Sequence, residues 1–289
     1  ELTVVVPDAA TAGNLVIDAP GTTVTIQAAN GTVLDTIEAI TAENTLIIGE
    51  GVTIKKLVVM GGNVVLKGNV KNVESDVETT ITLDEDITLA ESIVFNGNNI
   101  TLDMAGKTIT SSGDGIEVVG GTLTITGNGR VNAGTTGGQW VAVWANGGDV
   151  VIENGTYSVV ADTNNTTNDC IYAKGGQITI NGGTFSNVGT YVPSNGGVVI
   201  NANNGDKDPA YVGKIIINGG TFNPAEGCVP YEQKDVEAGR IELNNPVMNE
   251  TELKIAVAAG KNVKFGTDIT VESTVVVTKD LTIDLNGKT

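Results

Sequence analysis

Short apolar runs separated by turn residues dominate the pattern along the chain. The runs are four to six residues long, are rich in Val, Ile and Thr, and lie between clusters of Gly, Asn and Asp. Runs of β-branched residues between turn residues are typical of β-strands. The pattern therefore predicts many short strands and at most one amphipathic helix, over Glu250–Ala259.

The strand patterns recur with a fixed period. Gly-Gly doublets at 120–121, 147–148 and 175–176 are 27 and 28 residues apart, and each is followed by a four-residue strand pattern. Two further strand patterns end at Ile217 and Leu243, after 37 and 26 residues, so one repeat carries about ten extra residues. Periods in this range are typical of solenoids. Because no repeat contains a helix, strands alone must form the coil, which predicts an all-β parallel β-solenoid.

Equivalent positions of such a coil stack about 4.8 Å apart and form ladders of like side chains. The fifth position after the strand-ending aliphatic residue is large and apolar in four repeats: Tyr157, Phe185, Phe222 and Met248. The first position after it is polar: Glu153, Asn181, Asn218 and Asn244. The first set predicts an interior ladder of large apolar side chains. The second predicts a ladder of amides that hydrogen-bond along the axis.

Repeated phrases carry a family resemblance. Ile-Asn-Gly-Gly-Thr-Phe occurs at 180–185 and at 217–222, and a second phrase is Ile100-Thr-Leu-Asp-Met-Ala-Gly-Lys-Thr108. Over about residues 80–250 the chain resembles the right-handed single-stranded parallel β-helix of the pectate-lyase-like superfamily. It is similar in particular to repetitive surface proteins of gut Bacteroidetes and to some phage structural proteins. This resemblance implies a fold and a location that is extracellular or at the cell surface, and it implies no reaction.

Differences in texture divide the chain into three parts. Strand patterns come at shorter spacings over residues 1–77, which predicts an N-terminal small-rung β-solenoid module or cap. Residues 78–249 form the predicted parallel β-helix. Residues 250–289 are expected to start a second, truncated β-helix repeat, because Asp86 to Thr108 returns as Asp268 to Thr289. The first residue, Glu1, suggests a processed or trimmed product, which is compatible with secretion.

Net charge and hydropathy limit the partners. The formal net charge is -18, and the 16 Lys and Arg residues are spread singly along the chain. Without a basic stripe to follow a phosphate backbone, no nucleic-acid partner is expected. No apolar run approaches the about 20 residues that cross a bilayer, so no transmembrane segment is expected.

The residue inventory argues against the usual enzymes of this fold. The chain has no His, which excludes a Ser-His-Asp triad or a Cys-His pair and argues against a typical zinc site. The polygalacturonase-like set of aspartates with an adjacent pair and a His is also absent. Hydrolysis needs two facing carboxylates, for which the candidates are Asp114, Glu117, Asp162 and Asp169. We interpret these four as solvated turn or face residues. Polyuronate lyases need clustered cations, and the cations between residues 109 and 248 are isolated.

No cofactor is expected. Calcium is the metal with candidate segments, the oxygen-rich stretches 162–169 and 203–208, but neither has EF-hand spacing, and solvated loops are the favoured interpretation. The repeat phase also bears on Cys170 and Cys228, which fall at equivalent positions with one rung between them. Their Cα atoms should be about 9 to 10 Å apart, whereas a disulfide needs less than about 7 Å. We therefore expect two free thiols.

The aromatic residues provide the candidate ligand site. Phasing the repeats places Ile116, Val143 and Ile171 in one interior column, and alternation then points Glu117, Trp144 and Tyr172 outward. With Trp140 and Asp169 nearby, Trp144 and Tyr172 would form a flat platform of the kind that stacks on sugar rings or anchors a partner protein. The alternative is that an inserted loop, 160–168 or 189–196, covers the platform.

These observations predict a secreted or cell-surface structural or adhesive β-solenoid module without catalytic activity. Its expected partners are a host or dietary glycan, bound by the aromatic platform, or a surface protein. One alternative is a polysaccharide lyase or glycoside hydrolase with a nonstandard site beside Trp144 and Asp169. Another is a phage fibre or head decoration protein.

Overall fold

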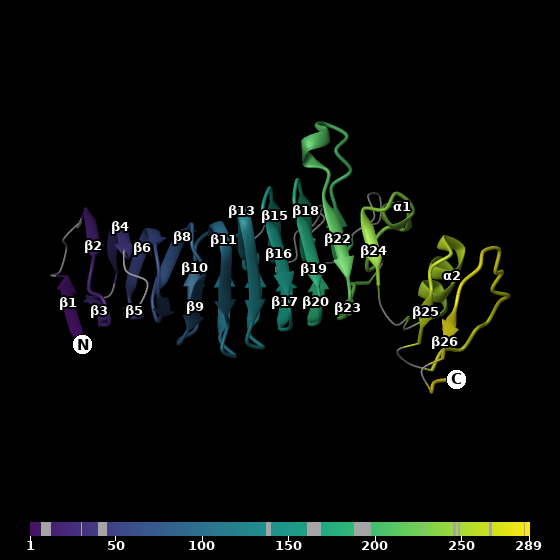
Figure 1. The fold of residues 1–289 in the computed structure, drawn as a ribbon, viewed down its shortest axis with the longest axis horizontal. Helices are drawn as coiled ribbons and strands as arrows, with labels where there is room; N and C mark the ends of the chain where they lie inside the picture. The colour runs from purple at the N-terminus through teal and green to yellow at the C-terminus, as the bar shows by residue number, and fades with distance from the viewer. Residues whose placement is uncertain are drawn as a thin grey trace.

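The computed structural model describes the chain as one long stack of parallel strands (Figure 1). The described residues are 1–6, 13–29, 31–39, 45–136, 140–160, 169–187, 198–226, 228–244, 247, 249–265, 268–285 and 287–289. Within them, one sheet has 18 strands, a second has six and a third has two, and all the pairings are parallel. The prediction of an all-β parallel β-helix is confirmed.

The strands stack in three columns. The first column contains β1 (Leu2–Val6), β3 (Thr23–Ala28), β5 (Thr45–Ile48), β7 (Asn63–Leu66), β9 (Thr79–Leu83), β11 (Ile93–Asp103), β13 (Ile116–Thr126), β16 (Asp149–Ile152), β19 (Gln177–Ile180), β22 (Lys214–Ile217) and β24 (Ile241–Leu243). The second contains β2 (Asn14–Ile17), β4 (Thr32–Ala39), β6 (Val52–Val59), β8 (Asn69–Ser75), β15 (Val143–Asn146), β18 (Ile171–Lys174) and β21 (Ile200–Ala202). The 11-residue strands β11 and β13 pair with both columns and join them into the 18-stranded sheet.

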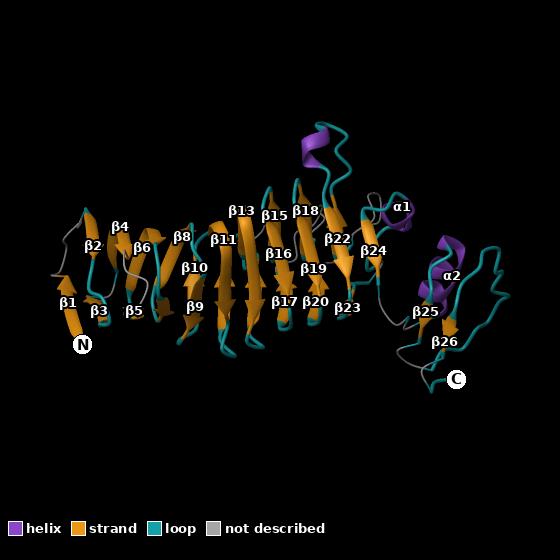
Figure 2. Cartoon of the chain, in the orientation of Figure 1, coloured by secondary structure: helices purple, strands orange, loops and turns teal. Residues whose placement is uncertain are grey.

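The third column is the six-stranded sheet. It contains β10 (Ile87–Leu89), β12 (Thr108–Ser111), β14 (Arg130–Ala133), β17 (Thr156–Val159), β20 (Thr184–Asn187) and β23 (Thr221–Asn223). Helices are few among the described residues (Figure 2): the 3₁₀ turn η1 (Pro209–Tyr211), α1 (Gln233–Glu237) and α2 (Glu250–Ala259). Within that part of the chain, no helix is both long and apolar enough to cross a membrane.

Rung length changes along the coil. Asn63 pairs with Thr80, 17 residues further on, whereas Thr122 pairs with Asp149, 27 residues further on. The longer rungs follow the start of the six-stranded sheet at β10, because each of them also supplies a strand to that sheet. The 18-stranded sheet runs without interruption past residue 77. The division into 1–77, 78–249 and 250–289 stays a prediction.

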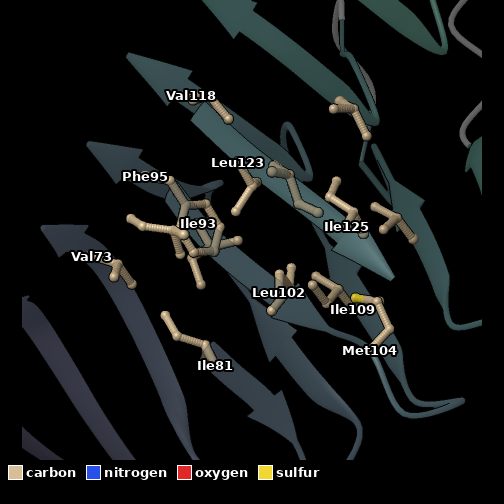
Figure 3. Packing of buried hydrophobic residues seen from close by; sticks show 14 of the residues in the cluster. Val73, Ile81, Ile93, Phe95, Leu102, Met104, Ile109, Val118, Leu123 and Ile125 are labelled. Carbon is tan, nitrogen blue, oxygen red and sulfur yellow. The ribbon is translucent and has the colours of Figure 1, made fainter. Parts of the chain in front are cut away.

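Alternating side chains fill the interior of the coil. Eleven aliphatic residues pair in register along the first column: Leu2, Val24, Leu46, Val64, Ile81, Leu102, Ile125, Ile152, Ile180, Ile217 and Leu243. All are buried except the two at the ends. Figure 3 shows side chains from neighbouring strands, among them Phe95, Leu102 and Ile109, packed together inside the coil. Burial of this apolar surface is the main stabilising contribution to the fold.

Both predicted ladders are present over the described residues. The rings of Tyr157, Phe185 and Phe222 stack with centroids 5.2 Å apart at each step. Met248, the fourth residue predicted for this ladder, lies outside the described residues. In the polar ladder, each amide donates to the rung before it: Asn181 to Glu153 at 3.0 Å, Asn218 to Asn181 at 2.9 Å and Asn244 to Asn218 at 3.1 Å.

The Gly-Gly pair of the repeated phrase turns the chain at a corner where backbones nearly touch. A Cβ on Gly182 would lie 2.6 Å from the carbonyl oxygen of Glu153 in the rung below. Gly183 has φ of +110°, a conformation that side-chain-bearing residues rarely adopt. Phe185 then enters the interior. The phrase Ile-Asn-Gly-Gly-Thr-Phe is therefore a structural corner.

Residues 247–289 form a second, smaller hydrophobic cluster. The predicted helix over Glu250–Ala259 is confirmed as α2; the side chain of Asn249 caps its first turn and Gly260, with φ of +72°, ends it. Buried residues of α2 pack with Val263, Phe265 and Ile269. The strands β25 (Val263–Lys264) and β26 (Ile283–Asp284) pair in parallel.

Candidate functional site

Trp144 and Tyr172 lie on the outer face of the second column, as predicted. Trp144 of β15 pairs with Tyr172 of β18, and their rings stack with centroids 6.2 Å apart and planes 28° apart. Glu117 occupies the same column one rung before them and Asn201 one rung after. The interior column of Ile116, Val143 and Ile171 also forms as predicted. Both rings are half-buried, so each keeps an accessible surface.

Trp140 stands at the edge of the same surface, held by its own contacts. Its indole Nε1 donates to the carbonyl oxygen of Thr136 at 2.8 Å. Its ring lies over Gly113, where an added Cβ would be 3.3 Å from indole Cζ3. Trp140 is half-buried against the core and is therefore a fixed wall.

The predicted site residues surround one cavity. A cavity of about 290 Å³ is lined by Asp114, Trp140, Val141, Trp144, Asp169, Tyr172 and Asn201. A neighbouring cavity of about 240 Å³ shares Asp169, Tyr172 and Asn201 and extends to Glu232, Lys234 and Asp235. The structure thus brings together all four residues that the sequence singled out: Trp140, Trp144, Asp169 and Tyr172. We call the two cavities together the aromatic groove.

Two carboxyl groups of the aromatic groove occupy equivalent rung positions. The pairing of Ile116 with Val143 and of Val143 with Ile171 places Asp114 two rungs before Asp169, about 9.6 Å apart at two strand spacings. Asp114 Oδ1 accepts from the backbone N–H of Val141, in the rung between them, at 2.6 Å. Its carboxyl group therefore leans toward Asp169.

Asp169 is almost fully buried. It is 9% exposed, and its Oδ2 accepts from the amide of Asn201 at 2.7 Å. The interpretation of Asp169 as a solvated turn residue is wrong, because the neighbouring rungs enclose its side chain. Asp114 is half-buried, so that interpretation is also wrong for much of its surface. Asp162 lies outside the described residues.

Burial changes the acidity of both groups. Desolvation raises the pKa of Asp114 to about 6, although the Val141 hydrogen bond opposes the rise and Glu117 adds to it. Desolvation raises the pKa of Asp169 to about 7, against the hydrogen bond from Asn201 and with a contribution from Glu232. Strongly shifted carboxyl groups in a cleft are a physical indicator of a functional site.

Two buried polar atoms of the groove lack hydrogen-bond partners. Over the described residues, Asp169 Oδ1 and Trp144 Nε1 are the buried side-chain nitrogen and oxygen atoms without a partner. A buried polar atom without a partner costs about 1–3 kcal/mol. One is an acceptor and the other a donor, and both residues line the 290 Å³ cavity.

The inserted residues of the 37-residue rung support the platform. They project from the coil between β21 and β22 (Figure 1) and contain η1. Asn203 donates to the hydroxyl of Tyr172 at 2.6 Å. The carbonyl oxygen of Tyr211 accepts from Gly175 at 3.1 Å, and Lys174 Nζ lies 4.3 Å from the Tyr211 ring centroid and 5.9 Å from that of Trp144. The sequence did not identify Lys174 or Tyr211; the ten-residue excess in this repeat was the available signal.

The oxygen-rich segment 203–208 binds its own backbone. Asn203 and Asn204 accept from the N–H groups two residues on, and Asp208 accepts from Ala210. Within the described ranges, no group of three His, Cys, Asp or Glu side chains is placed to hold a metal. Residues 162–168, the other calcium candidate, lie outside these ranges. So do residues 161–168 and 189–196, which leaves the expected loop cover of the platform a prediction.

The two cysteines are free, as predicted. Cys170 is fully buried beside Asp169, and its thiol donates to the carbonyl oxygen of Tyr157 at 3.2 Å. Burial raises the pKa of this thiol far above its usual range. Cys228 is partly exposed. A buried neutral thiol is chemically inert, so Cys170 is a packing residue.

Comparison with known proteins gives no family. No protein-family model matches the chain, and no curated protein and no solved structure matches it. The functional conclusion therefore rests on the geometry of the aromatic groove.

Proposed function

We propose that the protein is a secreted or cell-surface β-solenoid that acts as a structural or adhesive module and binds a glycan in the aromatic groove. The observation that carries this proposal is the stacked Trp144–Tyr172 pair beside buried polar atoms that lack partners. Stacked parallel strands give a rigid rod, which suits a module that presents a binding surface away from its point of attachment.

The groove has the composition of a sugar site. Aromatic faces of Trp140, Trp144 and Tyr172 offer flat apolar surface to the C–H faces of a sugar ring. A few buried polar groups, Asp169 and Asn201 among them, would fix orientation through hydrogen bonds. Tyr172 is held by Asn203 and Trp140 by Thr136, so the rings are ordered before the ligand arrives.

Charge narrows the class of glycan. Asp114, Asp169, Glu232 and Asp235 line the groove, and the whole chain carries a formal charge of -18. Lys234 forms an ion pair with Glu232, and Arg240 forms one with Asp235. This field repels polyuronates and sulfated chains, so a neutral glycan fits best.

A glycan array followed by titration calorimetry tests the proposal. Wild type should bind a set of neutral glycans, and Trp144→Ala should weaken binding at least tenfold because it removes half of the stacked pair. Met60→Ala, which changes a side chain 52% exposed in the N-terminal part, is the matched control and should bind as wild type does. Absence of glycan binding by wild type, or equal affinity of Trp144→Ala, would refute the proposal.

The second candidate is a glycoside hydrolase, favoured by Asp114 and Asp169. They line one cavity two rungs apart, and the lean of Asp114 brings its carboxyl group toward the separation of about 6.5–9.5 Å used by inverting enzymes. With pKa values of about 6 and about 7, one would be ionised while the other holds a proton between these values. Reducing-end release from a bound glycan, lost in both Asp114→Asn and Asp169→Asn, would support this candidate. Binding without release would exclude it.

A further inference from the structure

We propose that the aromatic groove recognises the acetamido group of an N-acetylhexosamine, with Asp169 Oδ1 accepting from its N–H and Trp144 Nε1 donating to its carbonyl oxygen. This inference rests on the proposed glycan binding and names the class of sugar. It starts from the two buried polar atoms without partners, which are an acceptor and a donor on residues that line the same cavity.

The pair of atoms states what the missing group must supply. It must donate one hydrogen bond and accept another, and both bonds form away from water, where an unmade bond is costly. A secondary amide has one N–H and one carbonyl oxygen on opposite sides of a planar group, which matches this requirement. A carboxylate offers acceptors alone and would meet Asp169 with like charge. An ammonium group offers donors alone and leaves Trp144 Nε1 without a partner.

The surroundings of the two atoms fit the rest of the acetamido group. Its methyl needs apolar contact, and the rings of Trp140, Trp144 and Tyr172 line the cavity. The amide is neutral, so it enters a groove lined by Asp114 and Asp169 without the repulsion that a uronate would meet. Asn201 already satisfies Asp169 Oδ2, which leaves Oδ1 as the oxygen for the ligand.

Three tetrasaccharides that differ at one carbon make the direct test. They are β-1,4-linked chains of N-acetylglucosamine, of glucosamine and of glucose, which carry an acetamido group, an ammonium group and a hydroxyl at C2. We expect calorimetry at pH 7 to give at least tenfold tighter binding of the acetamido chain than of the other two. The same comparison between N-acetylgalactosamine and galactose covers the other common hexosamine.

Two variants test the assigned atoms. Trp144→Phe keeps an aromatic ring and removes the N–H, so the preference for acetamido should fall at least fivefold while binding of the glucose chain persists. In Asp169→Asn, the side-chain oxygen accepts from Asn201 and the NH₂ faces the ligand N–H, so the preference should also fall. Met60→Ala should keep it, and circular dichroism checks that each variant is folded. If one variant fails to fold, the other carries the test.

The outcomes separate this inference from the function on which it rests. Equal affinity for chains with and without the acetamido group, in both the gluco and the galacto comparison, would overturn the inference and leave glycan binding intact. Preference for the ammonium chain would overturn it as well, because it would indicate recognition of charge. An undiminished acetamido preference in both Trp144→Phe and Asp169→Asn would refute the assigned atoms. No binding to any glycan would overturn the inference and the proposed function together.

Discussion

Replacing Phe185 by Ala tests whether the interior ladder stabilises the coil. Phe185 is fully buried between Tyr157 and Phe222, with ring centroids 5.2 Å away on both sides. Phe222 ends the stack, has one aromatic neighbour and is half-buried. The two positions carry the same side chain in the same repeated phrase, so they form a matched pair that differs in burial and in neighbours.

The magnitudes follow from these differences. Removal of a buried Phe side chain costs about 3–5 kcal/mol, and each lost ring contact contributes about 0.5–1.5 kcal/mol of that cost. Because Phe185 loses two ring contacts and leaves a void between two rungs, we expect about 4–5 kcal/mol for Phe185→Ala. Phe222→Ala loses one contact at a partly exposed site and should cost roughly half as much.

Urea unfolding, followed by circular dichroism and by Trp fluorescence, measures both free energies of unfolding. Tyr157→Phe is the internal control; it removes one hydrogen bond, from the hydroxyl to the carbonyl oxygen of Asn154 at 2.7 Å, and should cost about 1 kcal/mol. A cost for Phe222→Ala equal to or greater than that for Phe185→Ala would refute the reasoning, since the ladder would then not be loaded at its centre.

Three other outcomes follow from the described contacts. Asn218→Ala breaks two amide hydrogen bonds of the exposed ladder and should lower the free energy of unfolding by about 1–2 kcal/mol, measured by urea unfolding against Asn63→Ala as a control. Thiol titration of the native protein should label Cys228 readily and Cys170 after unfolding alone; rapid labelling of both would contradict the burial of Cys170. Because burial raises the pKa of Asp169 from 3.8 to about 7, the folded chain binds more protons between these values, and stability should fall as pH rises through them. Melting temperatures from pH 4 to pH 8 should fall less in Asp169→Asn, and an equal fall would exclude Asp169 as the cause.

The period of the sequence predicts positions well because a solenoid turns spacing directly into register. Once repeats are aligned on their Gly-Gly doublets, each residue has a known neighbour in the next rung. The outward pairing of Trp144 with Tyr172 and the stack of Phe185 on Tyr157 follow from this alignment alone. The prediction of two free thiols follows from it too.

Environment is what the period does not predict. Asp169 stands next to a strand in a segment rich in Asn and Asp, which is typical of a solvated turn. Its burial depends on Asn201, one rung later, and on the residues around Glu232, more than 60 positions further on. The contact of Lys174 with Tyr211 similarly depends on how an inserted segment folds back. Such contacts are set by packing between non-equivalent positions, for which the repeat carries no information.

The repeat of Asp86 to Thr108 at Asp268 to Thr289 separates what a phrase specifies from what its support specifies. In the first copy, the N–H of Thr108 donates to Asp86 Oδ1 at 2.7 Å; in the second, that of Thr289 donates to Asp268 Oδ1 at 2.8 Å. The pairing of β25 with β26 likewise repeats the register of Ile81–Thr82 on Leu102–Asp103.

The segments before the two copies differ. In the first copy strand β8 precedes the phrase, and at the matching place before the second lies helix α2, whose buried face packs on Val263 and Phe265. The same register therefore forms beside a strand and beside a helix. The phrase must specify its own rung through its turn and its carboxylate contact, while the neighbouring element supplies apolar cover. A solenoid whose rungs are specified in this way can begin afresh within one chain, because each new copy needs a hydrophobic surface beside it and no particular strand below it.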